Sequence, residues 1–188
     1  MEIQVTTRAE MEQLARREAF KVSCNPAVLH LGSRIVAGQP DAVRKFFPAS
    51  MRFVGLDFIA GPGVDVVADI HKLGEDPLLM DFDVVWSDAV LEHLERPWVA
   101  AAAMAKVTRV GGVCFHVTHQ TFPLHAVPSD YWRFSTEGLR VLFCPEVGWE
   151  VIRTAYCWPC VAMSVAGESP MPCNTPCFVH AMLLARRV

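Results

Sequence analysis

The chain has 188 residues, of which 52% are hydrophobic, and a formal net charge of −3 at pH 7. This length and hydrophobic content suffice for one sizeable core but not for two ordinary domains and a linker, so we expect a single domain. The lack of a basic excess argues against nucleic acid as a partner. No stretch approaches the roughly 18 consecutive apolar residues that a membrane span needs.

Cysteine usage and the N-terminal residues predict a cytoplasmic protein. The first residues lack the basic lead and apolar core of a signal peptide. Seven cysteines, an odd number, then favour reduced thiols over a disulfide framework. Four thiols near the C-terminus, followed by His180, also have a spacing that zinc sites use. We expect no metal there, because small buried residues are common at strand ends, and zinc stays the alternative.

A first helix is predicted within residues 1–22. Thr7 and Glu10 have the spacing of a capping box, and apolar residues follow at helical spacing with charged residues between them. In a sheet protein such a helix covers an edge or closes over the ligand cleft, and covering an edge is the more common role.

Strands and helices then alternate over residues 27–143. The first predicted strand, 26–32, is apolar almost throughout, as expected for a strand covered on both faces of a parallel sheet. A helix is expected from residue 39 until Pro48 ends it, and another over 97–107, where proline suits the first turn. Further strands are expected at 52–57, 64–69, 82–86 and 113–117, the last one after a break at Gly111-Gly112.

The remaining chain predicts a closing strand pair at 149–188. Ser135 opens a helix through Phe143, and residues 149–156 and 178–185 form strands. The segment 161–176 is too rich in Pro, Gly and Ser for regular structure. This order of elements predicts an α/β fold with one doubly wound, mostly parallel sheet whose last strand runs antiparallel.

Polar residues follow the first three predicted strands where each strand ends. Gly32 and Ser33 follow the first strand, Asp57 ends the second and Asp69 ends the third. Carboxyl ends of parallel strands face one crevice, so these groups can meet one ligand. Gly32 would let the backbone approach it, Asp57 would accept from ribose hydroxyls, and Asp69 would reach a base amine. We predict a nucleoside-containing cofactor, with helix capping as the alternative role of each aspartate.

The fourth predicted strand turns abruptly into a polar segment. Ser87 and Asp88 follow it, and we expect them to open a helix at the rim of the same crevice. Glu92 and His93 lie on that helix. Histidine is the side chain best tuned as a base near neutral pH, so His93 is a candidate base with Glu92 as its orienter. Packing under the cofactor loop is the alternative role of His93.

The loop 118–134 is rich in histidine, proline and aromatic residues. Loops after strand ends carry specificity, and this composition predicts a rigid wall beside the substrate. His119 and His125 are further candidate bases. Arg133, flanked by Tyr131 and Trp132, would bind a carboxylate or phosphate on the substrate. In the alternative, the aromatic residues anchor the loop and Arg133 pairs with an acid such as Asp130.

Taken in order, these motifs resemble class I S-adenosylmethionine-dependent methyltransferases over residues 27–143. The segments that carry the resemblance are 28–34, 54–57, 64–69, 82–85, 91–93 and 107–112. The nearest subgroup has a Gly-Ser-Arg first loop, a Gly-Pro-Gly-Val-Asp segment and a later Asp-Tyr-Trp-Arg-Phe. The resemblance implies a Rossmann-like fold with a cofactor-binding core at 27–143 and methyl transfer from S-adenosylmethionine to a small-molecule acceptor.

The resemblance also implies roles for individual residues. Gly32 would lie under the methionine part of the cofactor, Asp57 would hold the ribose, Asp69 would approach the adenine, and Ser87 would border the methyl-donor end. His30 stands where the family usually has an acidic residue and would contact the ammonium group through a neutral ring nitrogen. Since methyl transfer is an in-line displacement, positioning supplies much of the catalysis, and His93, His119 or His125 would take the acceptor's proton.

Two other functions remain as alternatives. The departures at His30 and at residues 33–36, where the family has a glycine-rich loop, favour a degenerate member that binds the cofactor or a partner without turnover. An NAD(P)-dependent reductase is the lesser alternative. It would need Gly-x-Gly-x-x-Gly after the first strand, where this chain has only Gly32 before Gly38.

Overall fold

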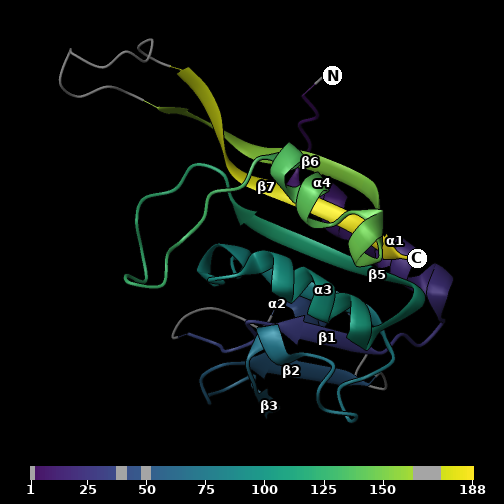
Figure 1. The fold of residues 1–188 in the computed structure, drawn as a ribbon. Helices are drawn as coiled ribbons and strands as arrows, with labels where there is room; N and C mark the ends of the chain where they lie inside the picture. The colour runs from purple at the N-terminus through teal and green to yellow at the C-terminus, as the bar shows by residue number, and fades with distance from the viewer. Residues whose placement is uncertain (1–2, 37–41, 48–51, 163–174) are drawn as a thin grey trace.

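The protein folds around one seven-stranded sheet with the strand order β3-β2-β1-β4-β5-β7-β6 (Figure 1). The structure is a computed structural model that describes residues 3–36, 42–47, 52–162 and 175–188. The strands are β1 (Val28–Leu31), β2 (Phe53–Asp57), β3 (Val66–Val67), β4 (Phe82–Asp88), β5 (Thr108–His119), β6 (Trp149–Ala162) and β7 (Thr175–Arg187). Strand β7 runs antiparallel to both β5 and β6, and all other neighbouring strands in the described residues are parallel. This arrangement confirms the predicted α/β fold.

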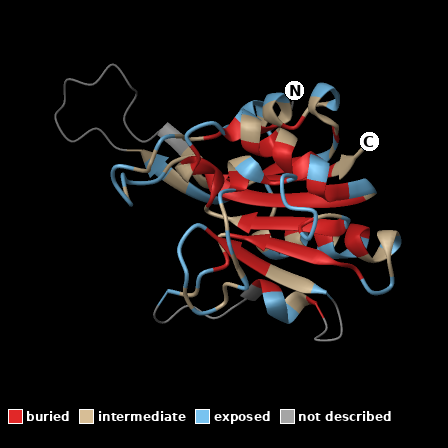
Figure 2. Cartoon of the chain, turned by 60° about the horizontal axis from the view of Figure 1, so that its bottom comes forward, coloured by how far each residue is buried: buried red, intermediate tan, exposed pale blue. Residues whose placement is uncertain are grey.

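Helices cover both faces of the sheet. They are α1 (Arg8–Val22), α2 (Ala42–Phe46), α3 (Pro97–Val107) and α4 (Thr136–Leu142), with short 3-10 helices η1 (Ile70–Lys72), η2 (Leu91–His93) and η3 (Pro145–Val147). Residues of α1 and α2 pack on one face with Trp86 and Phe115, and those of α3 and α4 pack on the other with Phe82 and Val85. The central strands are therefore buried from both sides (Figure 2), which explains their continuous apolar runs.

Local signals place the two long helices correctly. Thr7 caps α1 and forms the predicted capping box with Glu10. Pro97 occupies the first turn of α3, which ends at Val107 as expected. In contrast to the edge-covering role expected for it, α1 packs on a face of the sheet against β4, β5 and β7, and Arg8 at its start reaches the carboxyl end of β4. None of the helices in the described ranges is long and apolar enough to cross a membrane.

Two strand boundaries differ from the sequence prediction. β4 continues through Asp88 because its end pairs with β5, with Ser87 beside His116. The helix expected to open at Ser87 is therefore only the turn η2, which follows Ala89 at a φ of 51°. β5 already begins at Thr108, and Gly111, with a φ of 85°, lies in an irregular part of the strand instead of breaking the chain before it.

The outer parts of the sheet also differ from expectation. β3 has only the residues Val66–Val67, because it pairs with β2 over two positions at the edge of the sheet. β6 and β7 extend to Ala162 and from Thr175, so both ends of the segment expected to be irregular are strand. Its middle part, 163–174, and with it Cys173, lies outside the described residues.

Candidate functional site

The carboxyl ends of three adjacent strands lie at one edge of the sheet. Leu31 at the end of β1 pairs with Leu56 of β2 and with Ser87 of β4. Gly32 follows at a φ of 70°, and a Cβ atom there would overlap the side chain of Val90. Glycine is thus required at position 32, because the residue has a positive φ and because its backbone lies close to Val90. This contact joins the first loop to the turn that carries Glu92 and His93.

Asp57 is buried at the end of β2 and holds the first loop. Its carboxylate accepts hydrogen bonds from the backbone N–H groups of Arg34 at 3.2 Å and of Ile59 at 3.0 Å. Ionised carboxylates have about four lone-pair positions, so acceptor capacity is left for further donors. Ser33 is buried beneath the same loop, and His30 is buried in β1 with its ring edge towards Phe53.

Asp69 has the alternative role considered for it, that of a helix cap. It accepts a hydrogen bond from the backbone N–H of His71 at 2.9 Å at the start of η1, and its carboxylate lies 2.7 Å from His71 Nδ1. Desolvation raises the pKa of this carboxyl, but the hydrogen bonds from His71 outweigh that effect, so the pKa is lowered overall. About half of the Asp69 side chain is exposed, and both contacts with His71 involve the same carboxylate oxygen, Oδ1.

Ser87 and Asp88, which the sequence predicts at the rim of a cofactor site, each have a side-chain partner within the protein. Ser87 is fully buried, and its Oγ lies 2.7 Å from His116 Nδ1. Burial lowers the pKa of His116 to about 3, so the imidazole is neutral. Asp88 is bound by the Arg8 guanidinium through contacts of 2.5 and 3.3 Å. The side chain of Ser87 therefore faces a buried partner instead of the expected methyl-donor end.

The structure brings the three predicted bases together. The rings of His93 and His125 have centroids 4.8 Å apart, and those of His119 and His125 are 5.0 Å apart. Phe122 stacks on His119 at 4.0 Å. His180 of β7 pairs directly with His119 of β5, at 5.0 Å between rings, and was not predicted as part of this site. Its position depends on the strand register, for which the sequence has no local signal.

Each of these histidines has a different environment. Burial, aided by His180 and His125, lowers the pKa of His119 to about 4. His93 Nδ1 lies 2.5 Å from the carbonyl oxygen of Ser129, so this nitrogen carries the proton and donates. When His93 is neutral, its free lone pair is then on Nε2, which is the atom that can accept a proton.

Glu92 is fully buried between the turn η2 and the end of β5. Its Oε2 accepts a hydrogen bond from Thr118 Oγ1 at 2.7 Å. Its Oε1 lies 3.1 Å from His119 Nε2, but the two atoms do not have hydrogen-bond geometry, and Oε1 has no other partner in the described chain. Desolvation raises the pKa of this carboxyl. The backbone carbonyl of Glu92 accepts from the N–H groups of Tyr131 and Trp132, which fastens the loop to the turn.

The loop 118–134 is held together from within. Arg133 donates to both carboxylate oxygens of Asp130 at 2.6 and 2.8 Å and also to the carbonyl oxygens of Phe122 and Pro123. The Arg133 hydrogen bonds keep the pKa of Asp130 well below its usual range. Trp132 donates to the carbonyl of Leu94 at 2.8 Å. The pairing considered as the alternative role of Arg133 is therefore the one that the structure has, while Tyr131 is partly exposed.

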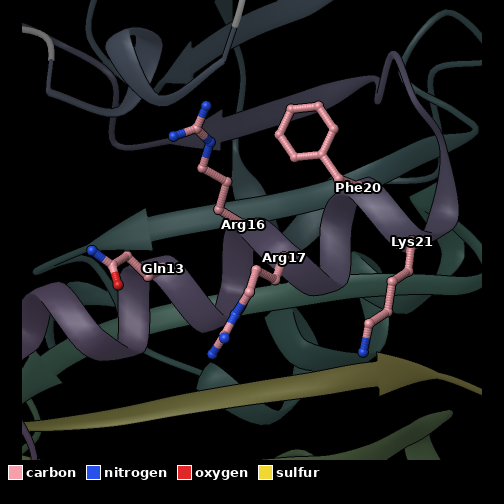
Figure 3. Close-up of a pocket in the computed structure, with 5 residues that line it drawn as sticks. All are labelled: Gln13, Arg16, Arg17, Phe20 and Lys21. Atoms are coloured by element: carbon pink, nitrogen blue, oxygen red, sulfur yellow. The ribbon is translucent and has the colours of Figure 1, made fainter.

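Two other features lie apart from this site. An open depression on α1 is lined by Gln13, Arg16, Arg17, Phe20 and Lys21 (Figure 3). It lies towards the end of α1 opposite to Arg8 and includes none of the predicted site residues. Among the thiols, Cys157 is buried in the core, and Cys160 and Cys177 pair across β6 and β7 with 3.2 Å between sulfur atoms. No metal-ligand cluster in the described residues includes a thiol.

Comparisons with known proteins agree with this architecture. Residues 46–116 match the family model described as a methyltransferase domain. No curated protein gives a significant match to the sequence. The solved structure of a putative methyltransferase from Bacillus halodurans C-125 has a TM-score of 0.65 at 14% identity and covers 95% of this chain and 97% of its own.

Two further solved structures have the same fold. The 1,6-didemethyltoxoflavin-N1-methyltransferase of Burkholderia thailandensis has a TM-score of 0.59 at 15% identity, covering 96% of this chain and 81% of its own. TehB from Haemophilus influenzae has a TM-score of 0.59 at 17% identity and covers 92% of this chain, which spans only 61% of the TehB chain. The fold is thus the Rossmann-like fold of methyltransferases.

Proposed function

We propose that this protein is an S-adenosylmethionine-dependent methyltransferase that acts on a small-molecule acceptor. The observation that carries the proposal is the meeting of Gly32, Asp57 and Asp88 at the carboxyl ends of three adjacent strands. The methyltransferase-domain match over 46–116 supports the cofactor and the reaction. A small acceptor is supported by the Burkholderia thailandensis enzyme, whose structure holds 1,6-didemethyltoxoflavin with S-adenosylhomocysteine in the same fold.

The residues at this edge fit such a cofactor. Gly32 lets the first loop pass close to Val90, where a Cβ atom would overlap the valine side chain. We assign the remaining acceptor capacity of Asp57 to the ribose hydroxyls, and the other carboxylate oxygen of Asp69 to the adenine amine. When bound, S-adenosylmethionine supplies an electrophilic methyl group on a sulfonium.

The other predicted cofactor residues act from beneath or beside this edge. His30 and Ser33 are buried below the first loop, where His30 takes the position of the family's acidic residue. We infer that Ser87 supports the end of β4 through His116 instead of contacting the ligand, and that Asp88 orders the rim through Arg8.

A hydroxyl or amine acceptor must lose a proton during methyl transfer. Of the three predicted bases we assign this role to His93, because Ser129 fixes its Nδ1 as a donor and leaves Nε2 to accept. His119 and His125 lie beside it and complete one wall of the acceptor site. The loop that bears Tyr131 and Trp132 is fastened to the same turn, so the wall is rigid.

Calorimetric titration tests the cofactor part of the proposal. S-adenosylmethionine and S-adenosylhomocysteine are each expected to bind one site per chain, and NAD is expected to give no response. A chain that binds neither of the first two compounds would refute the proposal. The departures from the family pattern at His30 and Arg34 favour a binding module without turnover as the second candidate. Formation of S-adenosylhomocysteine with a panel of small acceptors, lost in His93→Asn, separates the enzyme from that module.

A further inference from the structure

The carboxylate of Glu92 is an unusual feature of the candidate site. It is fully buried, and its Oε1 has no hydrogen bond from any described residue. A buried polar oxygen without a partner costs free energy, and nearly all such groups in native proteins are paired. The nearest polar atom, His119 Nε2, lies 3.1 Å away without hydrogen-bond geometry. The Oε1 atom of Glu92 is therefore available to accept a hydrogen bond or to bind a cation.

Two imidazoles face the same place. The ligand atoms of Glu92, His119 and His125 all lie within 4.8 Å of one another. Imidazole and carboxylate atoms bind zinc at about 2.0–2.2 Å, so two neighbouring ligands of one ion lie roughly 3–3.5 Å apart. The 3.1 Å between Glu92 Oε1 and His119 Nε2 agrees with that separation. His125 lies on the loop and is partly exposed, so only this ligand has to move closer.

The surroundings of His125 are those of a metal ligand. Its Nδ1 donates to the carbonyl oxygen of Pro123 at 3.3 Å and lies 3.2 Å from Asp130 Oδ2, and its backbone N–H donates to the same carboxylate at 2.9 Å. Metal-binding histidines almost always donate their other ring nitrogen to a carboxylate, a carbonyl or water, which orients the ring. With Nδ1 so engaged, Nε2 is the nitrogen that is left to bind. Arg133 holds Asp130 in turn.

We propose that Glu92, His119 and His125 bind one divalent transition-metal ion, with Zn²⁺ as the representative. Two imidazoles and one carboxylate form the protein ligand set of a catalytic zinc site with an open position, and hard ions such as Mg²⁺ prefer oxygen ligands. A second cluster, His93 with His125 and Asp130, is a poorer site, because both oxygens of Asp130 already accept from Arg133.

The metal gives the acceptor site a second means of activating a hydroxyl. An oxygen bound at the open position loses its proton more readily, because the ion stabilises the oxyanion. His93, whose ring lies 4.8 Å from that of His125, then accepts the proton at Nε2. The metal site itself does not depend on methyl transfer, but this role of the ion rests on the proposed function.

Zinc titration of the chelator-treated full-length chain tests the site. All variants carry Cys160→Ser and Cys177→Ser, because the paired thiols of β6 and β7 are soft ligands that compete for zinc. Calorimetry is expected to give one Zn²⁺ per chain. Glu92→Gln, which keeps the volume of the side chain and an acceptor for Thr118, and His125→Ala are each expected to weaken binding by at least about tenfold. Visible absorption of bound Co²⁺ is expected to change in both variants.

The controls are an exposed carboxylate and a half-buried imidazole outside the cluster. Glu95→Gln, three residues after Glu92, and His71→Ala on η1 are expected to leave Zn²⁺ affinity unchanged. Thermal unfolding shows whether each variant is folded, and Zn²⁺ is expected to raise the midpoint of the parent but not of His125→Ala.

A proton is the competing occupant, because a protonated Glu92 could donate to His119 Nε2. In that case the parent binds no stoichiometric Zn²⁺ or Co²⁺ at neutral pH, and the proposal is overturned. Binding that neither Glu92→Gln nor His125→Ala weakens overturns it as well. S-adenosylmethionine titration of the same samples keeps the two proposals apart, since a failed metal site leaves cofactor binding intact and a failed cofactor site leaves zinc binding intact.

Discussion

Replacing Gly32 with alanine tests the contact that joins the first loop to the turn η2. At a φ of 70°, an alanine is strained by roughly 1–2 kcal/mol. Its Cβ would also overlap Val90, and overpacking of this kind typically costs about 1–3 kcal/mol. The sum is roughly 2–5 kcal/mol. For a chain of this length each kcal/mol lowers the unfolding midpoint by about 2–4 °C, so we expect a decrease of roughly 4–20 °C.

Gly111→Ala is a matched control that measures the strain of alanine at a positive φ without the overlap. It has a φ of 85°, and a Cβ there would meet nothing within 4 Å. Gly111→Ala is therefore expected to cost only the backbone strain of roughly 1–2 kcal/mol. Val90→Ala in the Gly32→Ala background removes the overlap, and the double variant should regain part of the loss.

Thermal and urea unfolding of the three variants measure these terms, and calorimetry with S-adenosylmethionine measures the effect on the site. We expect Gly32→Ala to weaken cofactor binding as well, whereas Gly111→Ala leaves it unchanged. If Gly32→Ala is no less stable than Gly111→Ala, or if Val90→Ala does not rescue it, the close approach of the first loop to the turn before Glu92 is wrong.

Three further changes test other parts of the site. Asp57→Ala should weaken S-adenosylmethionine binding by well over tenfold in calorimetry, because two charge-assisted hydrogen bonds to the ribose are worth a few kcal/mol; an unchanged affinity in a folded variant contradicts the assignment. Arg133→Ala frees Asp130 and loosens the loop, so acceptor turnover should fall in a methyl-transfer assay while cofactor affinity stays nearly constant. His116 has a pKa of about 3 in the fold, below its unfolded value, so the unfolded chain binds more protons and stability falls as the pH decreases from about 6 towards 4. In urea unfolding at several pH values, His116→Asn should remove up to about 1.4 kcal/mol per pH unit of that slope, and an unchanged slope refutes a buried neutral imidazole.

The parts of the fold that sequence predicts are those with a local cause. The capping box of Thr7 and Glu10 and the proline at the first turn of α3 act within one helical turn, so both helices begin where expected. The apolar runs of β1 and β4 reflect burial on both faces, which the strand composition already contains. The antiparallel last strand follows from the order of elements.

The parts that sequence does not predict depend on partners far along the chain. A Ser-Asp pair is a good helix start, but β5 extends β4 through both residues, and the ladder outweighs the cap. The partners of the site side chains are equally distant. Asp88 pairs with Arg8, Ser87 with His116 and Glu92 with Thr118, and none of these pairs has a spacing that a sequence pattern marks. The three histidines could be named, but not their contacts with Glu92.

The turn η2 and the residue Val90 before it contact both the first loop and the loop 118–134. Val90 lies against the backbone of the first loop at Gly32, and two residues later the carbonyl of Glu92 accepts from the loop that carries Tyr131. A ligand that moves the first loop must displace Val90, and the same short turn places the Glu92 carboxylate and the His93 ring. The positions of Glu92 and His93 therefore depend on the first loop as well as on the loop 118–134. Glu92 is therefore held by two backbone hydrogen bonds to its carbonyl and by the Thr118 hydrogen bond to Oε2, while Oε1 has no partner among the described residues.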